Sequence, residues 1–216
     1  MPKIHAEDII IAVDSGIELL LKNKIKPHYF IGDFDSVGLD SLKKVEQNNE
    51  IEVVQLKREK DETDTEIAVD FCINKGFQEL NLINSLQGRF DHTLGILSAL
   101  ENALERGVQL KIISAMQEVY LAKHVQELDY PANTIFSLCP LTEAVSSVKT
   151  VNCLYPLNHE HLFRHKTRGI SNTISKNRAQ ISFNEGKLLV IVQLNNEQTH
   201  LYTSTSISEQ LNMHKA

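Results

Sequence analysis

The chain has 216 residues, and its hydrophobic fraction of 42% and charged fraction of 23% are typical of a globular protein with a substantial core. The 22 basic and 28 acidic residues give a formal charge of −6, and there is no basic tract, so a nucleic-acid backbone is not an expected partner. No apolar run is long enough to span a membrane, and the first residues lack the basic and apolar pattern of a secretion signal. We therefore expect a cytoplasmic protein that does not act at a membrane.

Short β-branched runs alternate with helical patterns in the first half of the chain. Strands are expected over residues 9–13, 28–32, 53–56, 80–84 and 110–114. Helices are expected after the first strand, over 63–75 and over 93–106, each stopped by a proline or a glycine. Strands that alternate with helices predict a mainly parallel sheet with helices on both faces, an α/β/α sandwich.

The pattern changes near residue 115, after which short alternating segments predict antiparallel strands over 119–122, 134–138, 179–183 and 188–192. Residues 184–187 are expected to form a hairpin turn, because Asn184 and Gly186 tolerate positive φ. No long helix is expected in this half, and the polar tail from Asn195 is expected to fray. We therefore predict two domains, an α/β domain over 1–118 and a small antiparallel β domain over 119–216.

Acidic residues stand where the expected parallel strands end. Asp14 follows the first strand, Asp33 and Asp35 follow the second, and Asp91 comes shortly after the strand over 80–84. Ligands of an open parallel sheet bind outside the carboxyl ends of its strands. These carboxylates are therefore candidates for a binding site.

The segment Asp33-Phe34-Asp35-Ser36 is the first candidate. Two carboxylates two residues apart in an extended chain point the same way and repel each other. Mg²⁺ would relieve that repulsion, because it prefers carboxylate oxygens and shares its remaining positions with phosphates. The alternative is that Asp35 or Ser36 caps the following helix.

The segment Lys60-Asp61-Glu62-Thr63-Asp64-Thr65-Glu66 also has two interpretations. Thr63 or Asp61 as an N-cap, with Glu66 completing a capping box after Thr63, accounts for the acidic residues at a helix start. Capping does not explain why this acidic segment and the Asp33 pair lie at adjacent sheet ends. A shared ligand would explain both.

The third candidate is Gln87-Gly88-Arg89-Phe90-Asp91-His92. Gly88 permits a close backbone approach, and Arg89 offers a planar fork that suits phosphate oxygens. Asp91 could orient Arg89, cap the helix or contact the substrate, and an ordinary strand-to-helix loop is the alternative. The chain has no Gly-Lys-Ser/Thr phosphate loop, which argues against a P-loop kinase.

These three segments, in this order, resemble those of the thiamin pyrophosphokinase (thiamin diphosphokinase) family. The segment Thr167-Arg168-Gly169-Ile170-Ser171-Asn172 is similar to that family's C-terminal signature, as is Ile181-Ser182-Phe183-Asn184-Glu185-Gly186 with the apolar strand after it. The likeness extends from about residue 9 to residue 192, which is most of the chain.

The resemblance implies an α/β/α catalytic domain that binds ATP and Mg²⁺, followed by a thiamin-binding β-sandwich domain. It also implies a homodimer with each active site at the subunit interface. The implied metal ligands are Asp33, Asp35 and Asp64. The residues implied to line the ATP and reaction site are Asp14, Thr63, Arg89 and Asp91, and those implied for catalysis are Asp64, Arg89 and Asp91. Ser171 and Asn172 would contact thiamin from the other subunit.

The expected reaction is an in-line attack of the thiamin hydroxyl oxygen on the β-phosphorus of ATP, which expels AMP. Two alternatives stay open, a diphosphotransferase for another hydroxymethyl compound such as a pterin, and a thiamin- or nucleotide-binding sensor without turnover. The sequence departs from the family pattern at Ser15 and Gln87, which replace glycines, and before residue 9, where members usually have an additional strand and loop. A side chain at either position could restrict the approach of a phosphate.

Overall fold

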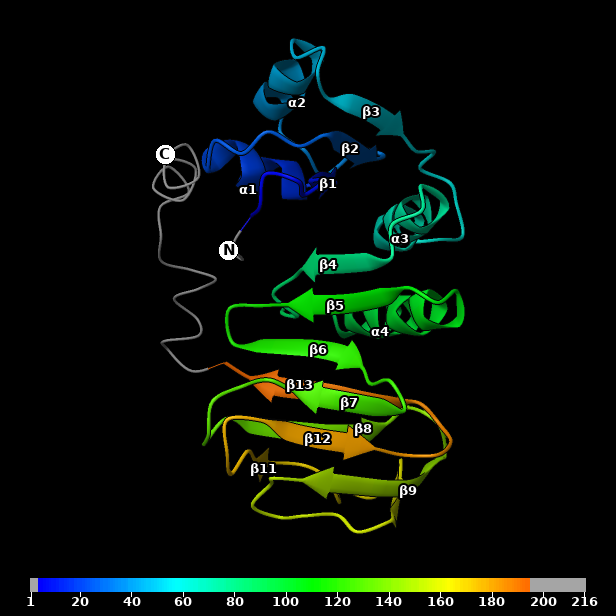
Figure 1. The fold of residues 1–216 in the computed structure, drawn as a ribbon. Helices are drawn as coiled ribbons and strands as arrows, with labels where there is room; N and C mark the ends of the chain where they lie inside the picture. Colours follow the sequence, from blue (N-terminus) through cyan, green and yellow to red (C-terminus); the bar gives the residue numbers. More distant parts are fainter. Residues whose placement is uncertain (1–3, 195–216) are drawn as a thin grey trace. The chain divides into compact units, whose positions relative to one another are not determined.

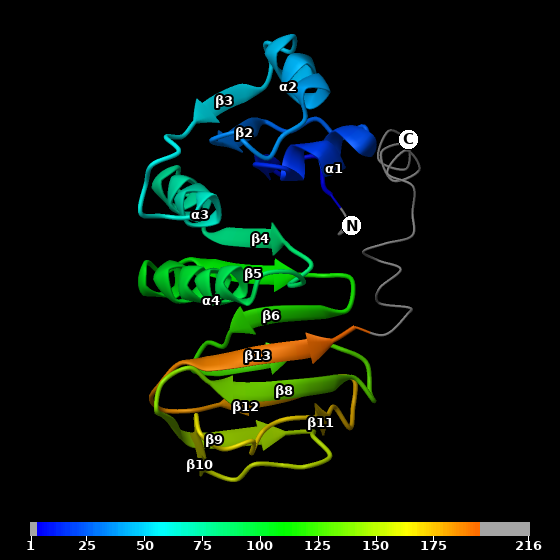
Figure 2. The same ribbon diagram turned by 180° about the vertical axis from the view of Figure 1, so that it is seen from behind.

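The structure of the chain is a computed structural model that describes residues 4–194. Contacts between residues divide the chain into two compact units (Figures 1 and 2). Within the described residues, the first unit comprises 4–77 and 89–99, and the second comprises 78–88 and 100–194. None of the helices between residues 4 and 194 has the length and apolarity that crossing a bilayer requires.

The first unit contains a parallel sheet with β2 between β1 and β3. Its strands are β1 (Ile11–Val13), β2 (Tyr29–Gly32) and β3 (Glu52–Gln55). The helices that alternate with them are α1 (Gly16–Lys22), α2 (Leu39–Glu46) and α3 (Asp64–Asn74) (Figure 1). These strands, and the helices after the first strand and over 63–75, lie where the apolar patterns predict them.

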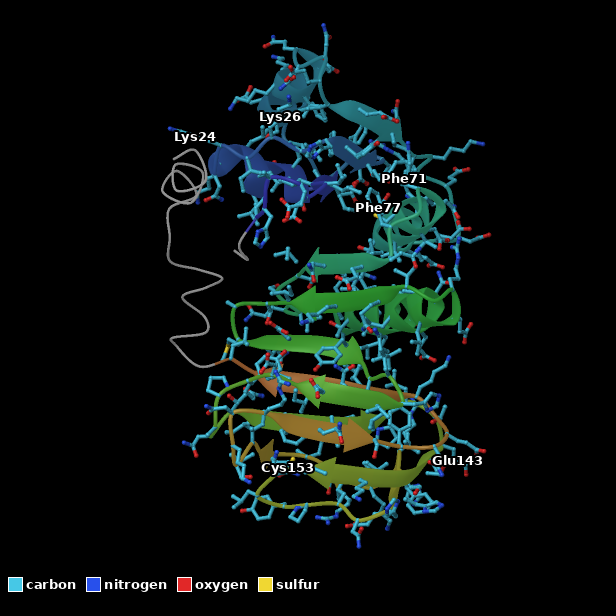
Figure 3. All side chains as sticks on the ribbon, in the orientation of Figure 1. Lys24, Lys26, Phe71, Phe77, Glu143 and Cys153 are labelled. Atoms are coloured by element: carbon cyan, nitrogen blue, oxygen red, sulfur yellow. The ribbon has the colours of Figure 1, made fainter. Side chains whose placement is uncertain are left out.

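Local packing and capping explain where these helices form. Helix α1 buries Ile17 and Leu20, which share one helical face. Helix α3 begins after Thr63, whose Oγ1 accepts a hydrogen bond from the Glu66 N–H at 3.2 Å, so the predicted Thr63 N-cap is confirmed. Further along α3 lies Phe71, which is labelled in Figure 3. Its ring packs edge-on against the Tyr29 ring of β2, with the two centroids 5.0 Å apart.

The capping alternative for the Asp33 segment is wrong. The N-cap residue of α2 is Gly38, which has no side chain to accept a hydrogen bond. Neither Asp35 nor Ser36 occupies that position. The acidic character of the segment therefore needs an explanation other than helix capping.

The second unit is built on two sheets that face each other (Figure 2). Over the described part of the chain, the first sheet has the order β11-β8-β13-β6-β5-β4 and the second has the order β10-β9-β12-β7. Among the described strands of these two sheets, only β4 and β5 pair in parallel. The first sheet contains β4 (Glu79–Ile83), β5 (Gln109–Ile113), β6 (Gln117–Leu121), β8 (Ile135–Pro140), β11 (Asn172–Thr173) and β13 (Leu188–Gln193). The second contains β7 (Val125–Leu128), β9 (Ala144–Val151), β10 (Glu160–Phe163) and β12 (Ala179–Ser182).

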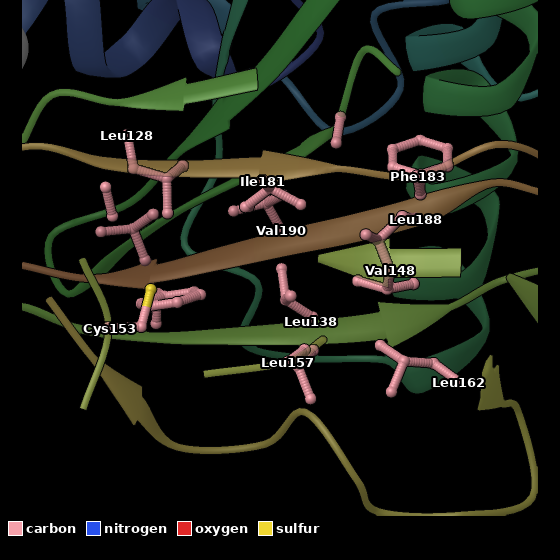
Figure 4. Packing of buried hydrophobic residues seen from close by; sticks show 14 of the residues in the cluster. Leu128, Leu138, Val148, Cys153, Leu157, Leu162, Ile181, Phe183, Leu188 and Val190 are labelled. Carbon is pink, nitrogen blue, oxygen red and sulfur yellow. The ribbon is translucent and has the colours of Figure 1, made fainter. Parts of the chain in front are cut away.

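Apolar side chains from both sheets fill the space between them (Figure 4). Leu138 and Val190 come from the first sheet, whereas Val148 and Ile181 come from the second, and each is at most 1% exposed. The α/β fold class, with a parallel sheet and an antiparallel β-sandwich, is therefore confirmed. The domain limits of 1–118 and 119–216 stay a prediction.

Helix α4 (Phe90–Glu105) links residues of both units and begins three residues before its predicted start. Asp91 lies in its first turn, where a carboxylate is favoured by the helix dipole. The described residues contain no long helix after position 115, as expected. The tail from Asn195 lies outside the described residues.

The predicted hairpin over 184–187 is wrong. Strand β12 pairs with β7 and β9, whereas β13 pairs with β6 and β8, so the connecting segment crosses from one sheet to the other. Gly186 has a φ of 102°, and a Cβ there would lie 2.6 Å from the Ala144 carbonyl oxygen. The glycine permits a close crossing beside β9 rather than a tight turn between paired strands.

Candidate functional site

Asp14 and Gly32 lie together where β1 and β2 end. The Asp14 N–H donates to the Ile31 carbonyl at 2.9 Å, which holds the residue after β1 against β2. A Cβ at position 32 would overlap Asp14 Oδ1. Gly32 therefore makes room for the Asp14 carboxylate at the carboxyl end of the sheet.

The two carboxylates of the Asp33 segment have different surroundings. Asp33 Oδ1 accepts a hydrogen bond from the Asp35 N–H at 3.1 Å, and Phe34 between them has a φ of 66°. The chain therefore turns here, and the expected extended conformation is wrong. The Phe34 ring stacks on the Phe30 ring with centroids 4.4 Å apart. Asp33 is partly buried, whereas Asp35 is exposed.

Lys60 joins Asp33 to Asp64. Its Nζ lies 3.2 Å from Asp64 Oδ1 and 3.6 Å from Asp33 Oδ2, and it also donates to the Lys57 carbonyl at 3.1 Å. The side chains of Lys60, Asp33 and Asp64 are 13%, 11% and 19% exposed. Asp64 is the first residue of α3, so the positive end of the helix dipole also favours its negative charge.

Asp14 belongs to the same neighbourhood, because the charges of Asp64 and Asp33 act on its carboxyl group. Burial, followed by the nearby carboxylates of Asp64 and Asp33, raises the pKa of Asp14 from 3.8 to about 6. The Asp35 N–H, and then the Lys60 charge, lower the pKa of Asp33. Burial acts to lower the pKa of Lys60, but Asp64 and the other carboxylates outweigh it and raise that pKa. We call Asp14, Asp33, Asp64 and Lys60 the carboxylate cluster.

The chemistry of the cluster fits a hard divalent cation. Asp14 Oδ1 and Asp64 Oδ1 are buried, and neither makes a hydrogen bond within the described residues. Carboxylate oxygens that lack hydrogen bonds are suitable ligands for Mg²⁺. Between residues 4 and 194, no three His, Cys, Asp or Glu side chains are already arranged as a metal-binding group. Carboxylate oxygens that could bind a metal ion are thus present, and the Lys60 ammonium lies close to two of these carboxylates, Asp33 and Asp64.

Asp14→Asn is expected to make the metal-free protein more stable at pH 8. Ionised Asp14 is disfavoured in the folded state, so the free energy of unfolding of the parent protein contains a contribution that falls as pH rises from 3.8 to about 6. The variant lacks that contribution. Denaturant titrations from pH 3.5 to 8 should show a stability difference that grows through this window. Asp40→Asn, on the exposed surface of α2, controls for the change of charge. A difference independent of pH would contradict this prediction.

Arg89 and Asp91 form a bidentate salt bridge at the start of α4. Arg89 Nε donates to Asp91 Oδ1 at 3.1 Å and Nη2 donates to Oδ2 at 2.6 Å. The hydrogen bonds and charge of each partner raise the pKa of Arg89 and lower that of Asp91. These hydrogen bonds favour the orientation of Arg89 among the three roles considered for Asp91, and that role stays a prediction. Both side chains are well exposed, so the guanidinium can reach a ligand.

Ser171 and Asn172 differ in what their side chains do. Asn172 is 4% exposed, and its amide accepts from the Tyr155 N–H at 3.1 Å and donates to the Tyr155 carbonyl at 2.7 Å. Ser171 is exposed, has a φ of 56°, and its N–H donates to Ser137 Oγ at 3.0 Å. A direct contact between the Asn172 side chain and a ligand would have to compete with the Tyr155 hydrogen bonds.

Asn172→Ala should therefore lower the free energy of unfolding by about 2 kcal/mol, since it leaves the Tyr155 main chain without these partners. Chemical denaturation measures the loss. Asn184→Ala removes an exposed amide and should change stability by less than about 0.5 kcal/mol. Equal effects of the two substitutions would show that the Asn172 amide does not hold the Tyr155 segment.

Lys60 and Gly32 are the residues of this site to which we assigned no role from the sequence. The i,i+4 spacing of Lys60 and Asp64 is a detectable signal, because such pairs meet on helices. However, Lys60 precedes α3, so the contact depends on how the loop folds. The closeness of Gly32 to Asp14 has no local signal, because it depends on the pairing of β1 with β2.

The fold and the site define a two-part protein in which a parallel α/β sheet with carboxylates at its strand ends accompanies a β-sandwich. Residues 3–112 match the family described as "Thiamin pyrophosphokinase, catalytic domain", and residues 123–188 match "Thiamin pyrophosphokinase, vitamin B1 binding domain". The chain belongs to the thiamin pyrophosphokinase family. The resemblance inferred from the motifs is confirmed.

Individual relatives support this assignment. The chain is 29% identical over 185 residues to thiamine pyrophosphokinase of Bacillus subtilis (strain 168), covering 84% of this chain and 85% of the relative. The crystal structure of thiamine pyrophosphokinase from Bacillus subtilis aligns with a TM-score of 0.82 at 25% identity, covering 89% of this chain and 90% of the other. Thiamin pyrophosphokinase from Geobacillus thermodenitrificans aligns with a TM-score of 0.79 at 28% identity, covering 90% of each chain.

Proposed function

We propose that this chain transfers the diphosphate group of ATP to the hydroxyl of thiamin, which yields thiamin diphosphate and AMP. Membership of the thiamin pyrophosphokinase family supports this reaction. The structural observation that carries the proposal is the convergence of Asp14, Asp33 and Asp64 at the carboxyl end of the parallel sheet. Nothing in the structure or in the relatives favours a pterin substrate or a sensor without turnover.

In this proposal Asp33, Asp35 and Asp64 hold Mg²⁺, and Asp14 and Thr63 line the ATP site. Mg²⁺ bound there would offset the negative charge of the phosphates, which an acidic protein needs to bind a polyphosphate. Two buried oxygens support this arrangement: Asp14 Oδ1, which makes no hydrogen bond, and Asp64 Oδ1, which has an ion pair with Lys60 but no hydrogen bond. The site thus supplies oxygen ligands and no covalent nucleophile.

Arg89 supplies the positive charge that the carboxylates lack. Its guanidinium, oriented by Asp91, would bind the oxygens of the diphosphate group during transfer and stabilise the charge that develops there. The hydroxyl proton of thiamin would pass to a carboxylate, with Asp64 or Asp91 as the acceptor. Positioning and charge neutralisation then supply most of the catalysis.

The proposal places thiamin against Ser171 and Asn172 of the partner subunit in a homodimer. The match of residues 123–188 to the vitamin B1 binding domain supports a thiamin role for this unit. Ser171 offers an exposed hydroxyl, and Asn172 shapes the site by holding Tyr155. A mixture of Asp64→Asn subunits with Ser171→Ala subunits should recover activity if each site uses both chains.

A cytoplasmic location, supported by composition alone, completes the proposal.

The deciding experiment incubates the purified chain with thiamin, ATP and Mg²⁺ and measures thiamin diphosphate and AMP together. Equal amounts of both products are expected. Thiamin binding by calorimetry without AMP release would show a sensor instead. Preferential consumption of a hydroxymethylpterin in a mixed assay would show the other diphosphotransferase. Either result would overturn the proposed function.

A further inference from the structure

Lys60 lies where a metal ion would have to compete for ligands. Its Nζ contacts Asp64 Oδ1 at 3.2 Å and Asp33 Oδ2 at 3.6 Å, and these are two of the carboxylates in the proposed metal site. It also donates a hydrogen bond to the Lys57 carbonyl at 3.1 Å. One hydrogen bond and two ion pairs hold the ammonium in place, so Lys60 is part of the site.

The three contacts lie in a protected environment. Lys60, Asp33 and Asp64 are each less than one-fifth exposed, whereas an exposed ion pair contributes little because water screens it. The cluster would otherwise concentrate negative charge, since Asp14 lies close enough to Asp33 and Asp64 for their charges to raise its pKa. Lys60 therefore offsets a like-charge repulsion in the metal-free protein.

We propose that Lys60 is an exchangeable counter-cation, which holds the carboxylate cluster together without metal and moves to a phosphate group when a divalent cation and ATP bind. This inference rests on the proposed function. A divalent cation bound to Asp33 and Asp64 would be within a few ångström of the ammonium and would repel it. The flexible four-carbon stem of Lys60 lets the charge move while the backbone stays.

The exchange has a thermodynamic consequence. A metal ion that binds without ATP must displace Lys60 from Asp33 and Asp64, and this displacement weakens the binding of the metal. ATP offers the displaced ammonium new phosphate partners, so metal and ATP should strengthen the binding of each other. Lys60 thereby makes occupation of the metal site depend on the presence of the nucleotide.

The test measures metal binding and ATP binding in Lys60→Met, which keeps a long apolar stem and removes the charge. Mn²⁺ alone, followed by electron paramagnetic resonance, should bind about tenfold more tightly than to the parent protein. ATP at saturating Mn²⁺ should bind about tenfold more weakly, because the lysine–phosphate contact is lost. Lys60→Arg keeps the charge and should retain weak Mn²⁺ binding. Lys44→Met, the same substitution on the exposed surface of α2, should change neither affinity.

The two affinities separate the possible outcomes. Unchanged or weaker Mn²⁺ binding by Lys60→Met would overturn the proposal, because Lys60 would then not compete with the metal. Unchanged ATP affinity in Lys60→Met would show that Lys60 does not move to a phosphate group, and would overturn that part of the proposal. Thiamin diphosphate formation by the parent protein is measured separately, so a failure of the proposed function is distinguished from a failure of the Lys60 role.

Discussion

Asp64→Asn is expected to lower turnover by about three orders of magnitude with little change in the free energy of unfolding. The substitution keeps the shape of the side chain but removes one negative charge from the cluster that would hold Mg²⁺. Folding tolerates the change, because the N-cap of α3 is Thr63, and because the substitution removes the repulsion between Asp64 and the nearby Asp14 carboxylate. Steady-state formation of thiamin diphosphate, with thermal unfolding of the same samples, measures both effects.

Asp61→Asn is the matched control for that prediction. Asp61 lies three residues earlier in the same segment, is exposed, and carries the same charge. Its substitution should leave turnover within about twofold of the parent protein, because a surface charge is screened. If Asp64→Asn turned over as fast as Asp61→Asn, the proposed metal role of the cluster would be refuted.

The strands of the first unit and its helices α1 and α3 could be predicted because their signals are local. Buried parallel strands read as continuous apolar runs, and the residues from Thr63 to Glu66 contain their own capping signal. The pairing of strands is not local in this way. The crossing segment around Gly186 has the residues of a hairpin turn, but its glycine serves a close approach to Ala144 in a different sheet.

Several strands of the sandwich were not predicted from the sequence. Strand β11 has two residues, which is too short for a periodic pattern. Strand β10 places exposed residues on either side of buried Leu162, so only its pairing with β9 marks it as a strand. Such segments form strands because the neighbouring strand supplies partners, and a sequence window does not contain that information.

The site could be predicted in part for the same reasons. The rule that ligands bind at the carboxyl ends of parallel strands selects Asp14 and Asp33, which the structure brings close to Asp64. The rule does not foresee the turn at Phe34, which leaves Asp35 exposed beside a partly buried Asp33. It also does not foresee Lys60 between two carboxylates, since this contact depends on the fold of a loop.

Gly169→Ala is expected to lower the free energy of unfolding by about 3 kcal/mol or more. Gly169 has a φ of 106°, and a Cβ there would lie 2.6 Å from the Leu138 carbonyl oxygen. Relief by a small shift is difficult, because the Gly169 carbonyl accepts a hydrogen bond from the Leu138 N–H at 2.9 Å and Leu138 is buried in the sandwich core. Chemical denaturation measures the loss, and the affinity for thiamin should fall with it because Ser171 follows closely.

Gly107→Ala separates the two causes of that loss. Gly107 also has a positive φ, of 75°, but a Cβ there would meet no atom within 4 Å. Its substitution should therefore cost only the backbone strain, about 1 kcal/mol. The excess for Gly169→Ala would then measure the collision with β8. Equal losses at the two positions would mean that the chain beside Leu138 moves away freely, and that Gly169 is required for its backbone angles alone.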